Sequence, residues 1–254
     1  MIRVLITGAN GQLGLALQEA AKDFPLDLIF LDKNSLNINN VEDIKEVFAS
    51  QSFDVCINAA AYTHVDGAEA NKELAYATNA TAVETLAKIC KQLECWLVHI
   101  STDYLFDGTL DRPYMPSDTP NPLNVYGASK LAGEQAIQAV GGTYSIVRTS
   151  WLYSQCGNNF YTKLQAQLDA GKTLQVTAAQ QGCPTRAEDL AAHLLTGIAN
   201  QQLSKGISHY CGSEVMTWLD LARRLFPNHE VLEWGGASSP TIRPKKVVLK
   251  NNNC

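Results

Sequence analysis

The sequence lacks several features that would assign it to common functional classes. Its 254 residues carry a net charge of −5, so the basic excess expected of a nucleic-acid-binding protein is missing. No apolar run is long enough to cross a bilayer, and the first residues lack the layout of a signal peptide. We therefore expect a cytoplasmic protein with no nucleic-acid partner and no membrane partner.

The seven cysteines lack the spacing of a zinc site or of a disulfide framework. Cys90 and Cys95 are five residues apart, with no second close pair and no flanking histidines. We expect free thiols in a reducing compartment. Hydrophobic residues make up 46% of the chain, an ordinary share for a globular protein that forms one large or two small domains.

The start of the chain alternates apolar runs with a helical pattern. Residues 3–7 form a short β-branched run, which is typical of a strand buried in a parallel sheet. Glycines follow at positions 8, 11 and 14, and then a helical pattern begins. This order predicts a tight loop that binds a pyrophosphate at the helix N-terminus. A glycine-rich turn without a ligand is the alternative.

A second apolar run, residues 26–31, ends at Asp32, 18 residues after Gly14. An acidic residue at this distance is placed to hold the hydroxyls of an adenosine ribose. Lys33 follows directly, and its cation suits a 2′-phosphate, so the choice between NAD and NADP stays open. The alternative is that Asp32 only belongs to a turn.

The ends of the predicted strands carry the remaining candidates. Residues 53–58 and 96–100 read as strands, followed by the run 59–63 and by Thr102. Because ligands of open α/β sheets bind beyond the carboxyl ends of the strands, we expect these segments to lie together with the glycine loop. Two histidines receive no chemical role: His64 is interpreted as a loop residue and His99 as a packed core residue.

Tyr126 and Lys130 are four residues apart on a predicted helix and so share one face. An ammonium beside a phenol favours the phenolate, which predicts a lowered pKa for Tyr126. A hydroxyl from Thr102 would share the same substrate oxygen. With a hydride carrier nearby, these groups are suited to carbonyl and alcohol redox chemistry. A solvated helix face is the alternative.

These patterns predict a Rossmann-type α/β fold with a doubly wound parallel sheet. We expect residues 1–150 to form the NAD(P)-binding domain and residues 151–254 a smaller, mainly substrate-binding region, from which some segments return to the first domain. Arg186 and Arg243 are candidate pyrophosphate ligands, with surface ion pairs as the alternative.

Several motifs in order resemble the extended short-chain dehydrogenases/reductases. They are Gly8-x-x-Gly-x-x-Gly14, Asn58-Ala-Ala-Ala-Tyr-Thr63, Ser101-Thr-Asp-Tyr104 and Tyr126-Gly-x-Ser-Lys130. More narrowly, the chain is similar to the dTDP-4-dehydrorhamnose reductase family, and the likeness continues to Arg243-Pro244. The resemblance implies reduction of dTDP-4-dehydro-L-rhamnose to dTDP-L-rhamnose by NADPH or NADH, in polysaccharide biosynthesis. A reductase of another nucleotide 4-keto-6-deoxysugar and a non-catalytic NADP-binding regulatory subunit remain alternatives.

The resemblance also implies roles for individual residues. Thr102, Tyr126 and Lys130 match the catalytic residues. The cofactor positions are Gly8, Asn10, Gly11, Gln12, Leu13, Gly14, Asp32, Lys33, Asn37, Ile38, Ala59, Ala60, Ala61, Tyr62, Thr63, Asn79, Tyr126 and Lys130. The substrate positions are Val65, Thr102, Asp103, Tyr104, Trp151 and Arg243.

Some positions depart from the family pattern. Ala179 stands where an acid is usual, and Asn37 stands where aspartate is frequent. Some members hold a metal between subunits through a glutamate early in the first helix; the matching residue is Ala16, so we predict no metal. The chain stops soon after Pro244, where relatives commonly add a closing helix. A monomer and a homodimer both fit the sequence.

Overall fold

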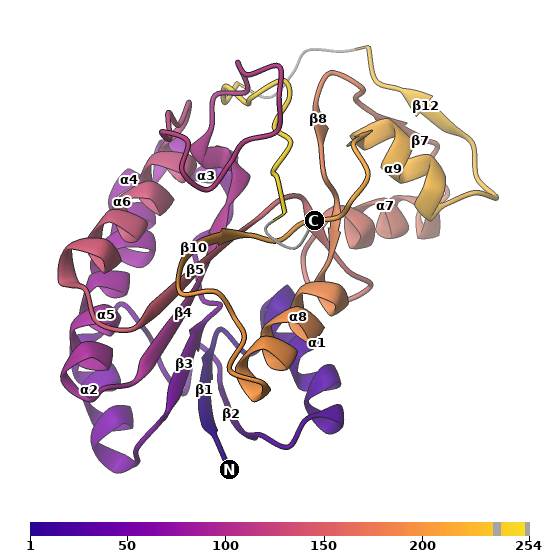
Figure 1. The fold of residues 1–254 in the computed structure, drawn as a ribbon. Coiled ribbons are helices and arrows are strands. Elements are labelled where there is room, and N and C mark those ends of the chain that lie inside the picture. Colours follow the sequence, from indigo (N-terminus) through magenta and orange to yellow (C-terminus); the bar gives the residue numbers. More distant parts are fainter. Residues whose placement is uncertain (236–239, 252–254) are drawn as a thin grey trace.

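The computed structural model describes residues 1–235 and 240–251. Within them, six parallel strands form one sheet in the order β10-β5-β4-β3-β1-β2 (Figure 1). The strands are β1 Arg3–Thr7, β2 Asp27–Leu31, β3 Val55–Asn58, β4 Trp96–Thr102, β5 Tyr144–Thr149 and β10 Gly206–His209. The order changes direction between β1 and β3, and such a switch point is where open α/β sheets bind ligands.

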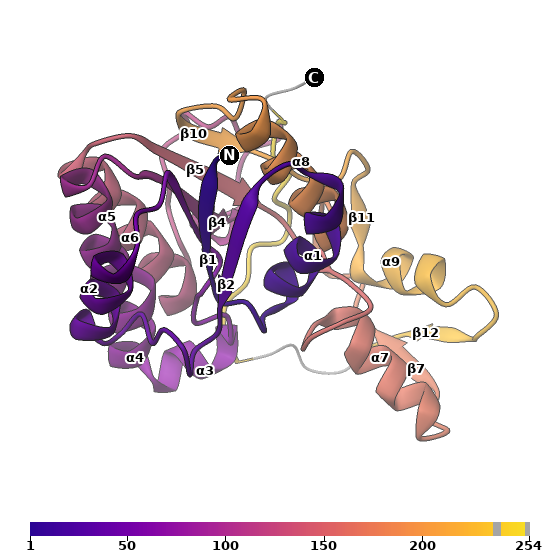
Figure 2. The ribbon, with the colours of Figure 1, turned by 90° about the horizontal axis from the view of Figure 1, so that it is seen from below.

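Helices cover both faces of the sheet (Figures 1 and 2). On one face lie α1 Gln12–Ala20 and α8 Ala187–Ala199, whose leucines pack on Val4, Ile6 and Val98. On the other lie α2 Val41–Ser50, α5 Ala82–Gln92 and α6 Val125–Val140, which pack on Leu5, Cys56 and Leu97. The alternating strand residues are apolar on both faces, as a doubly covered parallel sheet requires. The predicted doubly wound α/β fold is confirmed.

Short elements connect these layers. They are the 3₁₀ helices η1 Ala21–Asp23 and η3 Asp103–Leu105, α3 Val65–Ala70, α4 Lys72–Tyr76 and the π-helix η2 Ala77–Thr81. Together α3, α4 and η2 lie beside the start of α6 (Figure 1). A π-helical turn is rare and often marks a functional region.

The second half of the chain divides between the sheet and a smaller core. Strand β10 is an edge strand of the large sheet, and helix α8 packs on a face of that sheet. The smaller core joins Leu164, Val176, Leu219 and Phe226, and it stands away from the sheet in Figure 2. Its elements and their connections are β6 Leu152–Tyr153, α7 Phe160–Asp169, β7 Leu174–Val176, β8 Gln181–Gly182, β9 Thr185–Arg186, β11 Met216–Thr217, α9 Trp218–Leu225 and β12 Val231–Glu233.

The segment 240–251 returns from the smaller core to the loops of the first half. The backbone N–H of Tyr114 donates to Val248 over 2.7 Å, and the N–H of Val247 donates to Gln181 over 3.0 Å. Val247 and Leu249 share a buried cluster with Leu105 and Phe106. The segment therefore ties the two parts together. None of the helices in the described residues is long and apolar enough to cross a membrane.

Candidate active site

The glycine loop lies at the carboxyl end of β1 and needs its glycines. Gly8 has a φ of 69°, and a Cβ there would lie 2.8 Å from the nitrogen of Ala60. A Cβ on Gly14 would lie 2.4 Å from the carbonyl oxygen of Gly8. Helix α1 begins after Gly11 with no side-chain cap and no acid in its first turn. Its N-terminal N–H groups are therefore suited to an anion, and the loop fits a dinucleotide pyrophosphate.

Asp32 lies at the end of β2, beside this loop. Its Oδ2 accepts a hydrogen bond from Asn10 over 2.8 Å, and its Oδ1 accepts from the Ser35 nitrogen over 2.9 Å. The bonds from Ser35 hold the pKa of the carboxyl below its ordinary value, so Asp32 is ionised at neutral pH. Lys33 is exposed next to it. Ile38, by contrast, is only 5% exposed and packs in the core.

Asn79 holds the loop that follows β3. Its Oδ1 accepts from the Tyr62 nitrogen over 2.8 Å, and its Nδ2 donates to the Tyr62 carbonyl over 3.0 Å and to Ser129 Oγ over 3.0 Å. A Cβ on Gly133 would lie 2.1 Å from the Asn79 carbonyl oxygen, so this glycine lets α6 approach η2. Asn79 thus positions the loop of residues 59–63.

Thr102 and Tyr126 meet where α6 begins against the end of β4. The side chain of Thr102 lies close enough to the Tyr126 phenol to act on its pKa. A Cβ on Gly127 would lie 2.2 Å from the Tyr104 carbonyl oxygen, so the close approach depends on this glycine. Asn124 caps α6 by accepting from the Gly127 nitrogen over 2.9 Å. The two side chains that were predicted to share one substrate oxygen therefore lie near each other.

The prediction that Lys130 lowers the pKa of Tyr126 is wrong for this structure. Burial raises the pKa of the Tyr126 phenol, and the nearby Thr102 side chain only partly opposes the rise. The ammonium of Lys130 donates instead to the Ile100 carbonyl over 2.7 Å and lies 3.2 Å from Nε2 of His99. Tyr126 is therefore protonated at neutral pH, which is the form a proton donor needs.

Lys130 is buried close to the buried ion pair of Glu134 and Arg148. Burial lowers its pKa to about 8, and Glu134, one turn further along α6, opposes the shift. Glu134 is fully buried and pairs with Arg148 of β5 at 2.7 Å. The pairing of Glu134 with Arg148 depends on how α6 lies over β5. It fixes the helix that carries Tyr126 and Lys130.

His99 is buried as expected, but it is more than a packed residue. It lies between Asn58 and Lys130, at 3.1 Å and 3.2 Å. The pairing of strand ends could have revealed this contact, because Thr7, Asn58 and His99 occupy matching positions in neighbouring strands. His64 is exposed at the start of α3, in agreement with the loop interpretation.

Two of the predicted substrate residues, Tyr104 and Arg243, follow one another outward from Tyr126. Tyr104 packs edge-on against Tyr126, with ring centroids 5.5 Å apart. Arg243 donates to the Tyr104 hydroxyl over 3.3 Å and pairs with Asp66 of α3 at 2.9 Å, next to Val65. The end of the chain thereby reaches the site. Arg186 is exposed and lies 3.6 Å from Glu188, as in a surface ion pair.

Asp103 lies beneath this group with both oxygens in use. Its Oδ1 accepts from Thr102 over 3.2 Å and its Oδ2 accepts from Ser150 over 2.8 Å. Burial raises the pKa of Asp103 to about 6. With 3% exposure, the carboxyl orients Thr102 and has little surface left for a sugar.

Trp151 has a strained backbone and a stacked ring. Its φ is 47°, a left-handed conformation that is uncommon for a bulky residue and often occurs at functional sites. The indole stacks on Trp218 with a centroid distance of 3.7 Å and an angle of 2°. Trp218 in turn donates to Gln180 over 3.0 Å. One face of Trp151 is therefore covered, and a substrate would meet its remaining surface.

Comparisons with known proteins agree with this geometry. The model of the family "RmlD substrate binding domain" matches residues 2–252. The chain belongs to this family. A dTDP-4-dehydrorhamnose reductase of Escherichia coli strain K12 is 39% identical over 233 residues, which cover 89% of this chain and 77% of the relative.

Solved structures of relatives have the same fold. A dTDP-4-dehydrorhamnose reductase from Bacillus anthracis, solved in complex with NADP, superposes with a TM-score of 0.93 at 36% identity, covering 100% of this chain and 92% of that one. An orthologous dTDP-4-dehydrorhamnose reductase from Clostridium acetobutylicum gives a TM-score of 0.91, also at 36% identity, covering 98% and 90% of the two chains. The chain is thus a family member along nearly its whole length.

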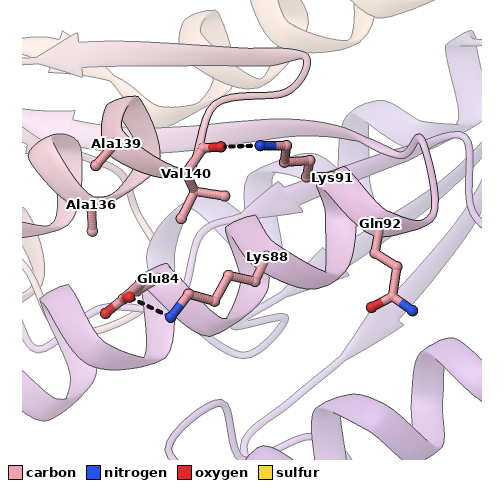
Figure 3. A pocket seen from close by; sticks show the side chains of 7 residues that line it. All are labelled: Glu84, Lys88, Lys91, Gln92, Ala136, Ala139 and Val140. Atoms are coloured by element: carbon pink, nitrogen blue, oxygen red, sulfur yellow. Dashed lines mark hydrogen bonds and ion pairs between the residues drawn. The ribbon is translucent and has the colours of Figure 1, made fainter.

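An open groove on the outer side of α5 and α6 carries none of the predicted site residues (Figure 3). Its two lysines are already paired: Lys88 with Glu84, and Lys91 with the Val140 carbonyl over 2.6 Å. We assign no ligand to it. Within residues 1–235 and 240–251, no group of three or more acidic, histidine or cysteine side chains is arranged to hold a metal ion. The six cysteines in these ranges are free thiols.

Proposed function

We propose that this protein reduces the 4-keto group of dTDP-4-dehydro-L-rhamnose with NADPH or NADH, giving dTDP-L-rhamnose. The observation that carries the proposal is the placement of Thr102 beside Tyr126 at the carboxyl end of β4, on the same rim as the glycine loop. The relatives named above as dTDP-4-dehydrorhamnose reductases support this substrate.

The residues present suit a nicotinamide dinucleotide. The uncapped start of α1 would take the pyrophosphate, and ionised Asp32 would hold the adenosine ribose. Lys33 lies where it would attract a 2′-phosphate, and the relative from Bacillus anthracis was solved with NADP. The dinucleotide would supply the hydride for C4 of the sugar.

The protein's own groups handle the proton and the charge. Tyr126, held protonated by burial, would donate its proton to the carbonyl oxygen as the carbon is reduced. Thr102 would hydrogen-bond the same oxygen and stabilise its developing charge. Lys130, one turn from Tyr126, would stabilise the phenolate left after proton transfer. Tyr104, Trp151 and Arg243 would bind the sugar and its diphosphate.

Replacing Tyr126 by phenylalanine tests this assignment. We expect Tyr126→Phe to lower the turnover number at least about a hundredfold, because the proton donor is lost, with little change in NADPH affinity. Turnover is followed by NADPH oxidation with dTDP-4-keto-6-deoxy sugar generated in situ, and affinity by fluorescence titration. Tyr161→Phe, on α7 beside Phe226, is the matched control and should keep normal turnover. A near-normal rate for Tyr126→Phe would refute the assignment.

The product and the cofactor preference are tested with the same assay. We expect the product to be dTDP-L-rhamnose, and a different deoxysugar would identify the enzyme as a reductase of another nucleotide 4-ketosugar. NADPH oxidation without any partner protein would exclude a purely regulatory subunit. Parallel rates with NADH show which nicotinamide is preferred. The cytoplasmic location and the choice between monomer and homodimer stay predictions.

A further inference from the structure

A row of buried polar side chains crosses the sheet and ends at Lys130. Thr7 of β1 pairs in register with Asn58 of β3, which pairs in register with His99 of β4. Each is at most 1% exposed. They lie side by side towards the carboxyl ends of their strands, on the sheet face that α2, α5 and α6 cover. On that face, the residues two positions earlier in each strand are apolar. A polar row in a hydrophobic layer is costly unless its groups satisfy one another.

The hydrogen bonds of the row are directional. Thr7 Oγ1 accepts from the Ala60 nitrogen over 3.3 Å and donates to Asn58 Oδ1 over 2.7 Å. Asn58 Nδ2 then faces Nδ1 of His99 at 3.1 Å, and Nε2 of His99 faces the Lys130 nitrogen at 3.2 Å. The row therefore begins at the loop after β3 and ends at the amine of Lys130, a residue one helical turn from Tyr126.

The row has two consistent proton arrangements. If Asn58 donates to Nδ1, the neutral imidazole carries its proton on Nε2, and this N–H needs an acceptor, which is the lone pair of an uncharged Lys130. If Lys130 is charged, it donates to Nε2, and the imidazole proton moves to Nδ1. The Asn58 amide must then turn its oxygen towards His99, because Nδ1–H needs an acceptor. Its Nδ2 would then donate to Thr7 Oγ1, which accepts in place of donating to Asn58.

We propose that His99 is a positioning residue for the reaction, and that its tautomer, set by Asn58 and Thr7, controls the position and the charge of Lys130. The part concerning the reaction rests on the function proposed above. Lys130 would be held against Ile100 and His99 until its ammonium is needed at Tyr126. Since Thr7 also accepts from Ala60, the loop after β3 would influence the charge of Lys130 through the row.

Other charged groups around Lys130 must be considered in any pH experiment. On its own helix, Glu134 raises the pKa of Lys130, and Tyr126 lies one turn away. From β5, Arg148 is bound to Glu134, and Asp103 after β4 acts on Tyr126. His99 itself stays neutral, because burial and the nearby lysine lower its pKa well below the ordinary value. The expected signal is thus a tautomer change of a neutral ring.

Nitrogen NMR of histidine-labelled protein tests the coupling without substrate. In the wild type we expect Nδ1 and Nε2 of His99 to exchange their N–H and lone-pair character as pH rises through the Lys130 pKa of about 8. In Lys130→Met we expect one tautomer from about pH 6 to about pH 10. A single His99 tautomer in the wild type, a change that persists in Lys130→Met, or conversion to imidazolium in this range would overturn the proposal.

Kinetics separate a positioning role from a merely structural one. For His99→Gln we expect the alkaline limb of the kcat profile to shift by about one pH unit. A loss of kcat that is equal at every pH would contradict the proposal. The control is His209→Gln at the end of β10, which should leave the profile unchanged. If the wild type fails to reduce the ketosugar, the proposed function fails, whereas the NMR titration still decides the coupling.

Discussion

At the scale of single residues, Asp103 shows how burial alters a carboxyl group at the site. It accepts hydrogen bonds from Thr102 and Ser150, and burial still raises its pKa to about 6. The two bonds favour the ionised form but do not offset the loss of water. Asp103 therefore makes part of the protein's stability dependent on pH.

Asp103→Asn should remove this dependence. In the wild type the native state binds more protons than the unfolded state between the ordinary pKa of 3.8 and the raised value of about 6. The free energy of unfolding therefore falls as pH rises through this window, by up to about 3 kcal/mol from this group. The difference in the free energy of unfolding, variant minus wild type, should therefore increase as pH rises from 4 to 7, as measured by urea unfolding. Asp111→Asn, in an exposed loop, is the control; parallel curves for Asp103→Asn and the wild type would contradict the prediction.

Sequence reasoning at this scale found the residues but not all their partners. Thr102 and Tyr126 were predicted because each follows from a local signal, a strand end and a helix spacing. The contact of Lys130 with His99 and Ile100 depends on how deeply α6 is buried, which no local pattern records. The predicted lowering of the Tyr126 pKa failed for the same reason.

At the scale of elements, two glycines determine where α6 lies. Gly127 allows contact with the Tyr104 carbonyl and Gly133 allows contact with the Asn79 carbonyl. Both contacts are to backbone, so neither neighbour can move aside as a flexible side chain would. The position of the helix that carries Tyr126 and Lys130 is thus set by backbone contacts at two points.

Gly133→Ala should therefore be costly although alanine favours helices. The added methyl would lie 2.1 Å from the Asn79 oxygen. The free-energy cost of this steric overlap exceeds the gain of about 1 kcal/mol that alanine brings in helix propensity. We expect a net loss of about 2 kcal/mol in the free energy of unfolding, with a lower affinity for NADPH as residues 59–63 shift. Gly235→Ala, where a Cβ meets nothing within 4 Å, is the control. Equal stability of the two variants would show that α6 tolerates displacement.

The strands and helices of the sheet could be predicted because their apolar patterns are local and regular. The last strand was harder to predict: β10 is only the four residues Gly206–His209, in a part of the sequence with little periodicity. Its place beside β5 follows from the long-range pairing of Ile207 with Ile146. The smaller core is built from strands of two or three residues, too short for any period to show.

At the scale of the whole molecule, Arg243 connects the end of the chain to the first half. It lies 177 residues from its partner Asp66, and the pair is partly exposed. Partly exposed pairs contribute little to stability. A guanidinium beside Tyr104 is, however, well suited to binding a diphosphate.

We therefore expect Arg243→Ala to affect binding more than folding. KM for the nucleotide sugar should rise at least about tenfold, with a smaller change in kcat, while the melting temperature changes by only a few degrees. Steady-state kinetics and calorimetry measure the two effects. Arg186→Ala, which removes a surface ion pair, should change neither. A large loss of stability with an unchanged KM would assign Arg243 a structural role instead.

The return of α8 and β10 to the large sheet has a consequence for protein engineering. A fragment ending at residue 150 would lack the edge strand β10. It would also lack α8, which covers the same face of the sheet as α1. Specificity therefore cannot be transferred between relatives by exchanging one terminal block. The natural units of exchange are residues 151–186, which lie between β5 and α8, and the segment that follows β10. Chimeras built at these three junctions should retain the recipient's cofactor site while adopting the donor's substrate contacts.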